Sequence, residues 1–538
     1  MPTKVQEILL DNEYLNNQNS NFRSYCQDLA DYGSPRKAWF NSMRYHGERV
    51  NFNFLYDSTL IRSARDLSSG IHSHLTNPTS RWFGIESEDL ELRKNGRIRR
   101  YYQDLQDWCY PALGKTNFYN VAKDFYHNTV LFGPGTYSIL DDSKMVASFN
   151  SIPCQQVNRV VDRNGNLMEI YINFKLNVRQ AIKMFGFNNL PETIQKSEAD
   201  KPFDEFDFVH FVGERFDRDV RYDDSKNMKY KSCWIAKKDK HLIAESGFHE
   251  MPYISEVFYS DENDPNGFSP AMMVLAETKL VNAMQRTVIR AGMKQTDPPI
   301  AVPSRGYMMP INFNPAALNY YDLKNPKDSL FQLPVAGNIS ISVEMIQMVQ
   351  ASIKDGMFIP LFKTLQDITK QLSILETQQL MAQNMSILGP VIDRYNKNVL
   401  GKTIERFINM GIRSGSAPQP PEELIELNSK YEIVYLSPLA KAQKQAEINE
   451  VQSFMADVHN IGGIIPAAYD KVDEDKLVDY LHRTRGITTE ILRDDEVMAQ
   501  MRKHREEQNQ IIAAMQMGQG AANMAKTGAE AAAVGAGQ

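Results

Sequence analysis

The segment from Phe268 to Pro310 constrains the fold most, because a helical pattern ends there abruptly in a Pro-rich stretch. Ser269-Pro270 offers a capping hydroxyl and then a proline at the first helical position, where the missing N–H costs nothing. Apolar residues recur at steps of three and four and predict one buried stripe: Met273, Ala276, Leu280, Met284, Val288 and Ala291. Asp297-Pro298-Pro299 cannot continue a helix, so we expect the helix to end before it.

A second helical pattern begins near Val343. Between the two lie short segments that suggest edge strands or loops: Ile300 to Pro303, Asn312 to Asn314 and Leu330 to Leu333. The chain therefore runs out along one helix, crosses an irregular excursion and returns along another. Such a long excursion is uncommon in a compact domain unless it has a role. A core helix followed by an ordinary surface loop is the alternative interpretation.

Composition limits the class of protein. With 538 residues, 42% of them hydrophobic, we expect a soluble protein with several sub-domains. No apolar run approaches the roughly 20 residues that span a bilayer, and the polar N-terminal segment is expected to be neither a secretory nor a transit peptide. Four cysteines without a CxxC pair indicate assembly in a reducing cell interior and argue against a zinc cluster. A net charge of −6 disfavours bulk phosphate neutralisation but leaves a local basic patch open.

The N-terminal part is predicted to be helical from Asn21 to Ser87 and again from Leu90 to Thr129. Within it, a helix from Asp57 to about Leu75 carries an apolar stripe of Leu60, Ala64, Leu67, Ile71 and Leu75, with Asp57 as a cap. Asn77-Pro78 should end this helix.

The region from Val130 to about Tyr259 is predicted to be β-rich. Its expected strands are Tyr137 to Leu140, Gln156 to Val161, Leu167 to Phe174, Phe208 to Val212, Ser232 to Ala236 and His241 to Ala244. The turn signal Asp162-Arg163-Asn164-Gly165-Asn166 predicts a hairpin between two of them.

Helix returns from Met357 to Ser414, where Gly389-Pro390 should kink or break it. Ser416 to Pro421 is a linker, Tyr431 to Leu436 is extended, and helices resume at Pro438. The Ala- and Gly-rich end from Gly518 is a weakly stable helix or a disordered tail. The fold class predicted from these patterns is α+β, mainly α.

The search for catalytic chemistry finds almost nothing. Gly401-Lys402-Thr403 resembles the end of a phosphate-binding loop, but Asn396 stands where that loop requires glycine, and the pattern around it is helical. His72 and His74 are two residues apart on a helix and so point to different faces. The acidic group Asp470, Asp473, Glu474 and Asp475 is interpreted as a solvated helix start. We therefore predict no catalytic residues, no cofactor and no metal.

Several motifs together resemble the head-to-tail connector, or portal, proteins of short-tailed bacteriophages. They are Tyr56-Asp57-Ser58-Thr59, Thr76-Asn77-Pro78, Arg81-Trp82-Phe83, Gly267-Phe268-Ser269-Pro270, Asp297-Pro298-Pro299-Ile300 and Leu436-Ser437-Pro438-Leu439-Ala440-Lys441-Ala442-Gln443. Their order and spacing and the chain length all fit this family. The run from Leu372 to Thr377 departs from the Thr-Ala-Thr-Glu-like pattern common in relatives.

The resemblance implies a dodecameric ring with wing, stem, clip and crown regions around a DNA channel. Laid onto this sequence, the regions are the wing 1–267 with its β-rich insertion 130–259, the outgoing stem helix 268–295, the clip 296–342, the returning stem helix 343–355, the channel loop and long wing helix 356–436, the crown 437–492 and the C-terminal helical barrel with its tail 493–538.

The resemblance also implies a place at one capsid vertex of the virion, after assembly in the host cytoplasm, and a set of partners. These are further copies of the chain, double-stranded DNA, the terminase large subunit, tail adaptors, major capsid and scaffolding proteins and internal core proteins, with no membrane. Cations assigned to the channel are Lys279, Arg286, Arg290, Lys294, Lys354, Lys363 and Lys370, and the clip docking surface is Arg305, Tyr307, Tyr320, Tyr321, Lys324 and Lys327. Solvent-facing or intersubunit salt bridges are the alternative for the stem cations.

Two other classes stay open at this point. A tail adaptor or coat component would share the absence of catalytic motifs. A packaging ATPase or nuclease would need the phosphate loop or carboxylate cluster that the sequence lacks.

Overall fold

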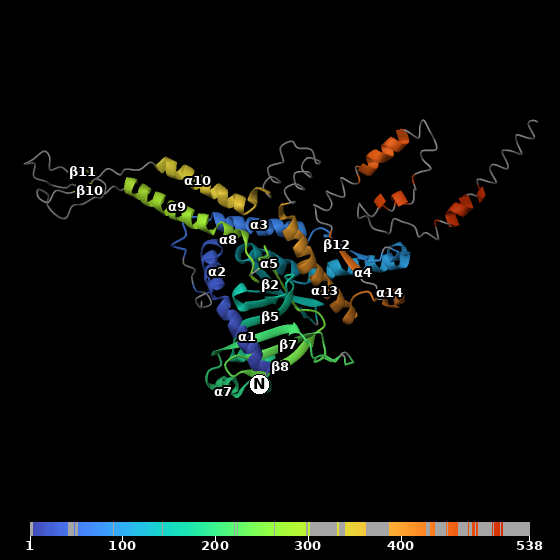
Figure 1. Cartoon of the computed structure of the whole chain (residues 1–538), viewed down its shortest axis with the longest axis horizontal. Helices are drawn as coiled ribbons and strands as arrows, with labels where there is room; N and C mark the ends of the chain where they lie inside the picture. Colours follow the sequence, from blue (N-terminus) through green and yellow to red (C-terminus); the bar gives the residue numbers. More distant parts are fainter. Residues whose placement is uncertain are drawn as a thin grey trace, which may run out of the picture. The chain divides into compact units, whose positions relative to one another are not determined.

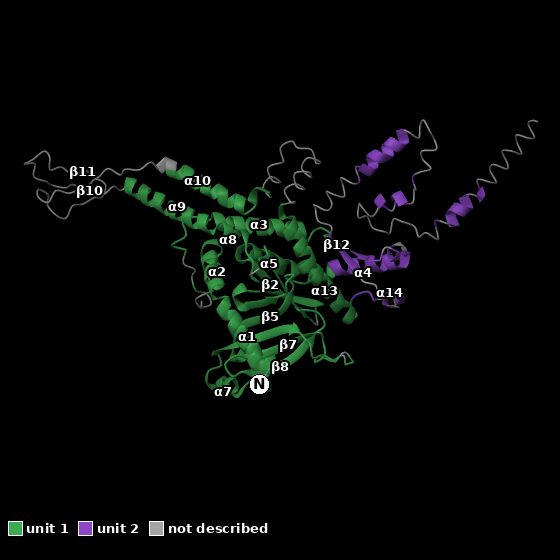
Figure 2. Ribbon diagram, viewed as in Figure 1, with its two compact units in different colours: residues 1–82, 111–416, 437–439 green, residues 83–110, 417–436, 440–538 purple. Residues whose placement is uncertain are grey.

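The computed structural model divides the chain into two compact units (Figure 1, Figure 2). Unit 1 comprises Met1–Trp82, Pro111–Ser416 and Ser437–Leu439, and unit 2 comprises Phe83–Tyr110, Ala417–Leu436 and Ala440–Gln538. The structure describes residues 4–40, 48, 52–89, 91–142, 144–219, 221–222, 224–262, 264–296, 300–301, 331–332, 339–361, 387–426, 431–435 and short stretches between 448 and 508. The acidic group near Asp473 and the Ala- and Gly-rich end lie outside these residues.

The described elements are mixed α and β and mainly helical, which confirms the predicted fold class at that level. The helices are α1 (Lys4–Gln18), α2 (Ser20–Gly33), α3 (Thr59–Leu75), α4 (Gly96–Lys115), α5 (Phe118–Phe132), α6 (Val178–Phe185), α7 (Glu192–Asp200), α8 (Pro270–Met273), α9 (Leu275–Thr296), α10 (Ile339–Gly356), α13 (Lys402–Arg413) and α14 (Glu422–Glu426). The strands are β1 (Phe83–Ser87), β2 (Pro134–Asp141), β3 (Ala147–Ile152), β4 (Val157–Val161), β5 (Leu167–Asn177), β6 (Glu205–Glu214), β7 (Tyr230–Ala236), β8 (His241–Phe248), β9 (Tyr253–Val257), β10 (Ile300–Ala301), β11 (Phe331–Gln332) and β12 (Tyr431–Tyr435).

A five-stranded antiparallel sheet in the order β4-β5-β6-β7-β8 forms one end of unit 1. The predicted hairpin joins β4 to β5: Asp162 N–H donates to the carbonyl of Asn166 at 2.9 Å, and Gly165 adopts φ +80°. All six predicted strands are present. The sequence prediction missed β3 and β9 and the helices α6 and α7 between β5 and β6.

Helices cover both faces of this sheet (Figure 1). Ile8 and Leu9 of α1 pack with Val209 on one face, and Val178 of α6 packs with Phe208 on the other. Phe208 and Val209 are neighbours on β6, so their opposite directions follow from the alternation along a strand. The sheet therefore needs apolar residues on both faces of β6, and Phe208, Val209, Phe211 and Val212 supply them.

An asparagine network fixes α1 on the sheet. Asn12 Nδ2 donates to Asn173 Oδ1 at 2.8 Å, and Asn158 Nδ2 donates to Asn12 Oδ1 at 2.9 Å. Asn12 and Asn158 are fully buried. A buried amide without a partner is costly, so the network stabilises one position of α1 along the sheet. A shift of the helix by one residue would leave these amides unpaired.

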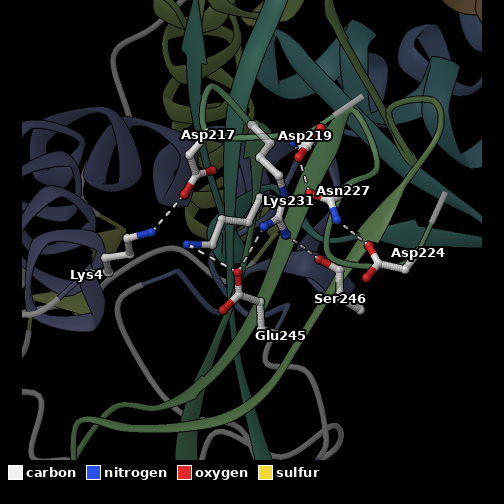
Figure 3. A network of polar contacts seen from close by, with 9 residues as sticks. Lys4, Asp217, Asp219, Asp224, Asn227, Lys231, Glu245 and Ser246 are labelled. Carbon is white, nitrogen blue, oxygen red and sulfur yellow. Dashed lines mark hydrogen bonds and ion pairs between the residues drawn. The ribbon is translucent and has the colours of Figure 1, made fainter. Parts of the chain in front are cut away.

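Polar contacts also brace the loop between β6 and β7 (Figure 3). The Arg215 side chain is only 6% exposed, and it donates to Glu245 Oε1 at 3.2 Å and to the carbonyl of Ser246 at 3.2 Å. Lys231 lies 3.6 Å from the same carboxylate. The exposed pair Lys4–Asp217, at 2.8 Å, adds little because water screens it.

The second sheet of unit 1 has the order β3-β2-β9 and packs against α5 and α13. Arg406 of α13 is buried, and its guanidinium donates to the carbonyls of Ile139 at 3.1 Å and of Glu250 at 2.8 Å. Before α13 the chain forms a π-helical turn over Tyr395–Gly401. Of the kink or break predicted at Gly389-Pro390, a break does not occur, because the helix continues through these residues from 387 to 394.

In unit 2, β1 and β12 pair antiparallel, with Phe83 opposite Tyr435. Arg93 joins the two strands by ion pairs to Glu86 at 3.0 Å and Glu432 at 2.9 Å. The predicted extended segment at Tyr431 is confirmed. The helix predicted as far as Ser87 is wrong for β1, because its pairing partner lies far along the chain and leaves no local signal.

Candidate functional site

The best-defined candidate site is the antiparallel pair α9 and α10, which lie side by side in unit 1 (Figure 1). The start predicted for the first helix is confirmed: Ser269 Oγ accepts a hydrogen bond from Met272 N–H at 3.1 Å and donates to the carbonyl of Leu131 at 2.8 Å. The helix ends at Thr296, before the Asp-Pro-Pro run, as expected. Beyond it, Ile300 pairs with Gln332 and Ala301 with Phe331.

The first helix differs from the prediction in two ways. It is interrupted at Val274, whose φ of −100° and ψ of 7° are not helical, so α8 and α9 are separate. The predicted apolar stripe is also wrong: Met273 and Leu280 are 60% and 52% exposed, Ala276 is exposed, and Met284, Val288 and Ala291 are only half-buried. The buried face consists of Val274, Leu275, Thr278, Val281 and Asn282. Two polar residues on this face set the rotation of the helix, which apolar spacing alone could not reveal.

Contacts with α10 explain why this face is buried. A Cβ added to Gly356 would lie 2.5 Å from Val274 Cγ1, so the two backbones approach closely at the point where α8 ends. Ser352 Oγ donates to Glu277 Oε1 at 3.1 Å. Ile346 and Ile353 of α10 are buried. The second helical pattern is confirmed, although α10 begins at Ile339, before Val343.

Asp57 connects this pair to α3. Its Oδ1 accepts from Thr59 N–H at 2.8 Å, although the N-cap position of α3 is Ser58, one residue after the predicted cap. Its Oδ2 accepts from Gln350 Nε2 of α10 at 2.6 Å. The predicted apolar stripe of α3, from Leu60 to Leu75, is buried throughout. One carboxylate therefore ties the start of α3 to α10.

Asn282 of α9 holds the segment before α3 by hydrogen bonds. Its Oδ1 accepts from the N–H groups of Tyr56 at 2.7 Å and Asp57 at 3.2 Å, and its Nδ2 donates to the carbonyl of Phe54 at 2.9 Å. We did not predict this residue as functional. In the sequence Asn282 lies on the polar face of the predicted helix, so no local signal indicated that it would be buried and would need a partner.

A pocket of about 550 Å³ lies between the segment before α3, α2 and α9. It combines cations with aromatic rings, and its lining residues are Tyr32, Asn53, Phe54, Tyr56, Lys279, Asn282, Ala283, Arg286, Thr287 and Arg290. Tyr32 and Phe54 meet edge to face, with ring centroids 6.0 Å apart. The described lining residues include no carboxylate, so they favour an anionic occupant.

The structure brings part of the predicted channel set together. Lys279, Arg286 and Arg290 line the pocket, and Lys294 and Lys354 are exposed elsewhere on the pair. Lys279 forms an ion pair with Asp28 at 2.6 Å and lies over the ring of Tyr32, as the salt-bridge alternative anticipated. Lys363 and Lys370 lie outside the described residues, as do the docking candidates Arg305, Tyr307, Tyr320, Tyr321, Lys324 and Lys327.

The other chemical candidates have structural roles. Thr403 is buried in a helix, and its hydroxyl donates to the carbonyl of Val399 at 2.6 Å, so Gly401-Lys402-Thr403 does not form a phosphate loop. His210 stacks on Trp234 and contacts Ser232 Oγ at 2.9 Å, and burial lowers the pKa of His210 to about 3. His72 contacts Thr76 Oγ1 at 2.8 Å. Among the described residues, no group of His, Cys, Asp and Glu could hold a metal ion.

The chain belongs to the family of bacteriophage head to tail connecting proteins, because the model of that family matches residues 6–492. Two relatives are similar over nearly their whole length. The portal protein of Salmonella phage epsilon15 is 25% identical over 532 residues, which cover 98% of this chain and 95% of the relative. The probable portal protein of Bordetella phage BPP-1 is 26% identical over 523 residues, which cover 96% and 93%.

These matches confirm the resemblance found in the sequence and support a portal function for a component of the phage particle. The family is one of structural connectors, which favours a structural protein over an enzyme. Within the part of the chain that the structure describes, no helix is both long and apolar enough to span a membrane.

Proposed function

We propose that the protein assembles as a ring at one capsid vertex, with the dodecameric symmetry of portals, and forms the channel for DNA during packaging and ejection. The observation that carries this proposal is the family match over residues 6–492 together with the two portal relatives. In the proposed arrangement α9 and α10 are the stem, residues 296–342 the clip and residues 437–492 the crown. The wing comprises 1–267, and the channel loop, the C-terminal barrel and assembly in the host cytoplasm follow the family pattern.

Exposed apolar side chains on the α9–α10 pair support assembly. Met293 is 65% and Met348 73% exposed, in addition to Leu280. A monomer would leave this apolar surface in water, whereas a neighbouring copy could cover it. Methionine suits such a contact because its flexible thioether adapts to a partner surface. A heterologous contact repeated around a closed ring leaves no copy uncovered.

The exposed cations of the same pair are the proposed DNA-proximal residues: Arg286, Arg290, Lys294 and Lys354, with Lys363 and Lys370 beyond the described part. Lys279 contributes less, because Asp28 neutralises it. The net charge of −6 per chain keeps the rest of the surface from holding a polyanion tightly. A channel with few cations lets the duplex slide.

The clip is the proposed docking surface for the terminase large subunit during filling and for tail adaptors afterwards. The wing would meet the capsid, scaffolding and internal core proteins. Deleting Arg305 to Asp328 should leave a folded wing and abolish docking of both motor and tail. Packaging at the normal level by this variant would refute the assignment of the clip.

Negative-stain electron microscopy of the purified chain tests the proposal itself. We expect closed rings with a central hole in the class averages. Shells or sheets would instead indicate a coat protein, and compact particles without a hole would indicate a tail adaptor. An ATPase assay on the same sample addresses the packaging-enzyme alternative, for which we expect no turnover because Thr403 is buried in a helix.

A further inference from the structure

We propose that the pocket beside α9 binds a nucleoside phosphate, with the phosphate on Arg286 and Arg290 and the base against Phe54 and Tyr56. This assigns a ligand site to residues that a sliding duplex would touch only in passing. The inference uses the geometry of one chain and does not depend on ring assembly.

Contacts within the chain hold the walls of the pocket in place. One wall is the segment Phe54 to Asp57, and Asn282 holds that wall by two accepted bonds and one donated bond. Asn282 is 8% exposed, so these bonds are largely shielded from water. The opposite wall is a regular helix. Both walls are therefore fixed before a ligand arrives, which reduces the entropy lost on binding.

The charge of the pocket calls for a phosphate. Arg286 and Arg290 are one helical turn apart and lie on the same face. Neither guanidinium forms a hydrogen bond or ion pair with another described residue. Lys279 is already paired with Asp28, so the two arginines carry the unneutralised charge. Planar guanidinium groups bind phosphate oxygens through two parallel hydrogen bonds.

The aromatic residues indicate which chemical group is attached to the bound phosphate. Phe54 is 39% and Tyr56 38% exposed, so part of each ring is free to meet a ligand. A flat base stacks on such a ring whatever its sequence. The volume of about 550 Å³ lies within the range of small-ligand sites. A base paired inside a duplex cannot reach these rings. The source is therefore a free nucleotide or the unpaired end of a DNA strand.

An acidic peptide is the competing class of ligand. A peptide could place acidic side chains on the two arginines, but it lacks the flat base that would stack on the exposed rings of Phe54 and Tyr56. The observations therefore favour the nucleotide.

Isothermal titration calorimetry on the full chain tests this inference. The probes are dAMP, deoxyadenosine, inorganic phosphate, a 5′-phosphorylated single-stranded oligonucleotide, a blunt duplex and an acidic peptide. We expect dAMP to bind at least about tenfold more tightly than either deoxyadenosine or inorganic phosphate, since each lacks one half of the contacts. Binding of the oligonucleotide would identify a strand end as a source, and binding of dAMP alone would identify the free nucleotide.

Two variants locate the site. R286Q/R290Q should weaken dAMP binding about tenfold or more, and F54L should weaken it less. The matched control R62Q/R65Q removes the same charge from exposed positions on α3 and should leave binding unchanged. Equal affinity for dAMP and inorganic phosphate, tighter binding of the peptide, or an equal loss in the control would overturn the proposal. Rings in the microscope with no dAMP binding would refute this inference alone, whereas dAMP binding without rings would refute only the proposed function.

Discussion

Replacing Asn282 with alanine should release the wall of the pocket. The side chain makes one hydrogen bond with each of Phe54, Tyr56 and Asp57. At about 1 kcal/mol net for each bond, N282A should favour local opening of this segment by roughly 3 kcal/mol. That energy corresponds to a roughly hundredfold faster exchange of the amides that become exposed on opening.

The matched variant N282D separates the two hydrogen bonds that Asn282 accepts from the one that it donates. A carboxylate still accepts from Tyr56 and Asp57 but cannot donate to Phe54. One bond is lost, and the carboxylate also faces the Phe54 carbonyl oxygen in a buried site, so the expected change is at least about 1 kcal/mol, or roughly fivefold or more in exchange. Gln285 has no hydrogen bond to another described residue, so Q285A on the same helix is the control and should leave exchange unaltered.

Hydrogen–deuterium exchange by mass spectrometry measures the effect on the full chain. Peptides covering residues 52–60 report the amides of Tyr56 and Asp57 directly, and peptides from β5 and β6 show whether the rest of unit 1 stays folded. If N282A and Q285A give the same exchange in residues 52–60, Asn282 does not hold the wall, and the pocket is less fixed than the contacts imply.

Two other changes have opposite expected signs, and one group makes stability depend on pH. G267A should destabilise the protein by more than about 3 kcal/mol, because Gly267 has φ +57° and a Cβ there would lie 2.2 Å from the Tyr259 carbonyl oxygen. G292A should stabilise by about 0.5–1 kcal/mol, since no atom lies near its Cβ and helix interiors favour alanine; thermal melting of both variants checks the pair. Burial lowers the pKa of His210 from 6.5 to about 3, so the unfolded chain binds the extra proton. Stability should be lost as pH falls from 6.5 toward 3, and H210Q should flatten the measured denaturation midpoint against pH over that range.

Local signals in the sequence predicted much of the fold. The capping of α8 by Ser269 depends on neighbours within three residues. The hairpin at Gly165 likewise depends on its own turn residues. Strand positions in the β-rich region followed from short alternating runs.

Contacts between distant parts of the chain could not be predicted in this way. β1 is a strand because β12 pairs with it, and nothing within Phe83 to Ser87 indicates that partner. Lys279 was predicted from its charge, but its ion pair with Asp28 depends on the packing of α2 beside α9. Asn282 was missed for the same reason, because its partners lie in another segment that the fold brings to α9.

The rotation of α9 links these misses to the function. Apolar spacing alone would bury Leu280, yet α9 buries Thr278 and Asn282 and leaves Leu280 52% exposed. The Thr278 hydroxyl donates a hydrogen bond to the carbonyl of Val274, and the Asn282 amide is hydrogen-bonded to the segment before α3. Burying these two side chains therefore leaves neither of them unpaired. Fully burying an exposed leucine or methionine would add about 1.5–3 kcal/mol, which this rotation leaves unrealised within one chain. A neighbouring copy packed on that face would recover it, so an arrangement that is unfavourable in a single chain is the one expected of a stem in a ring.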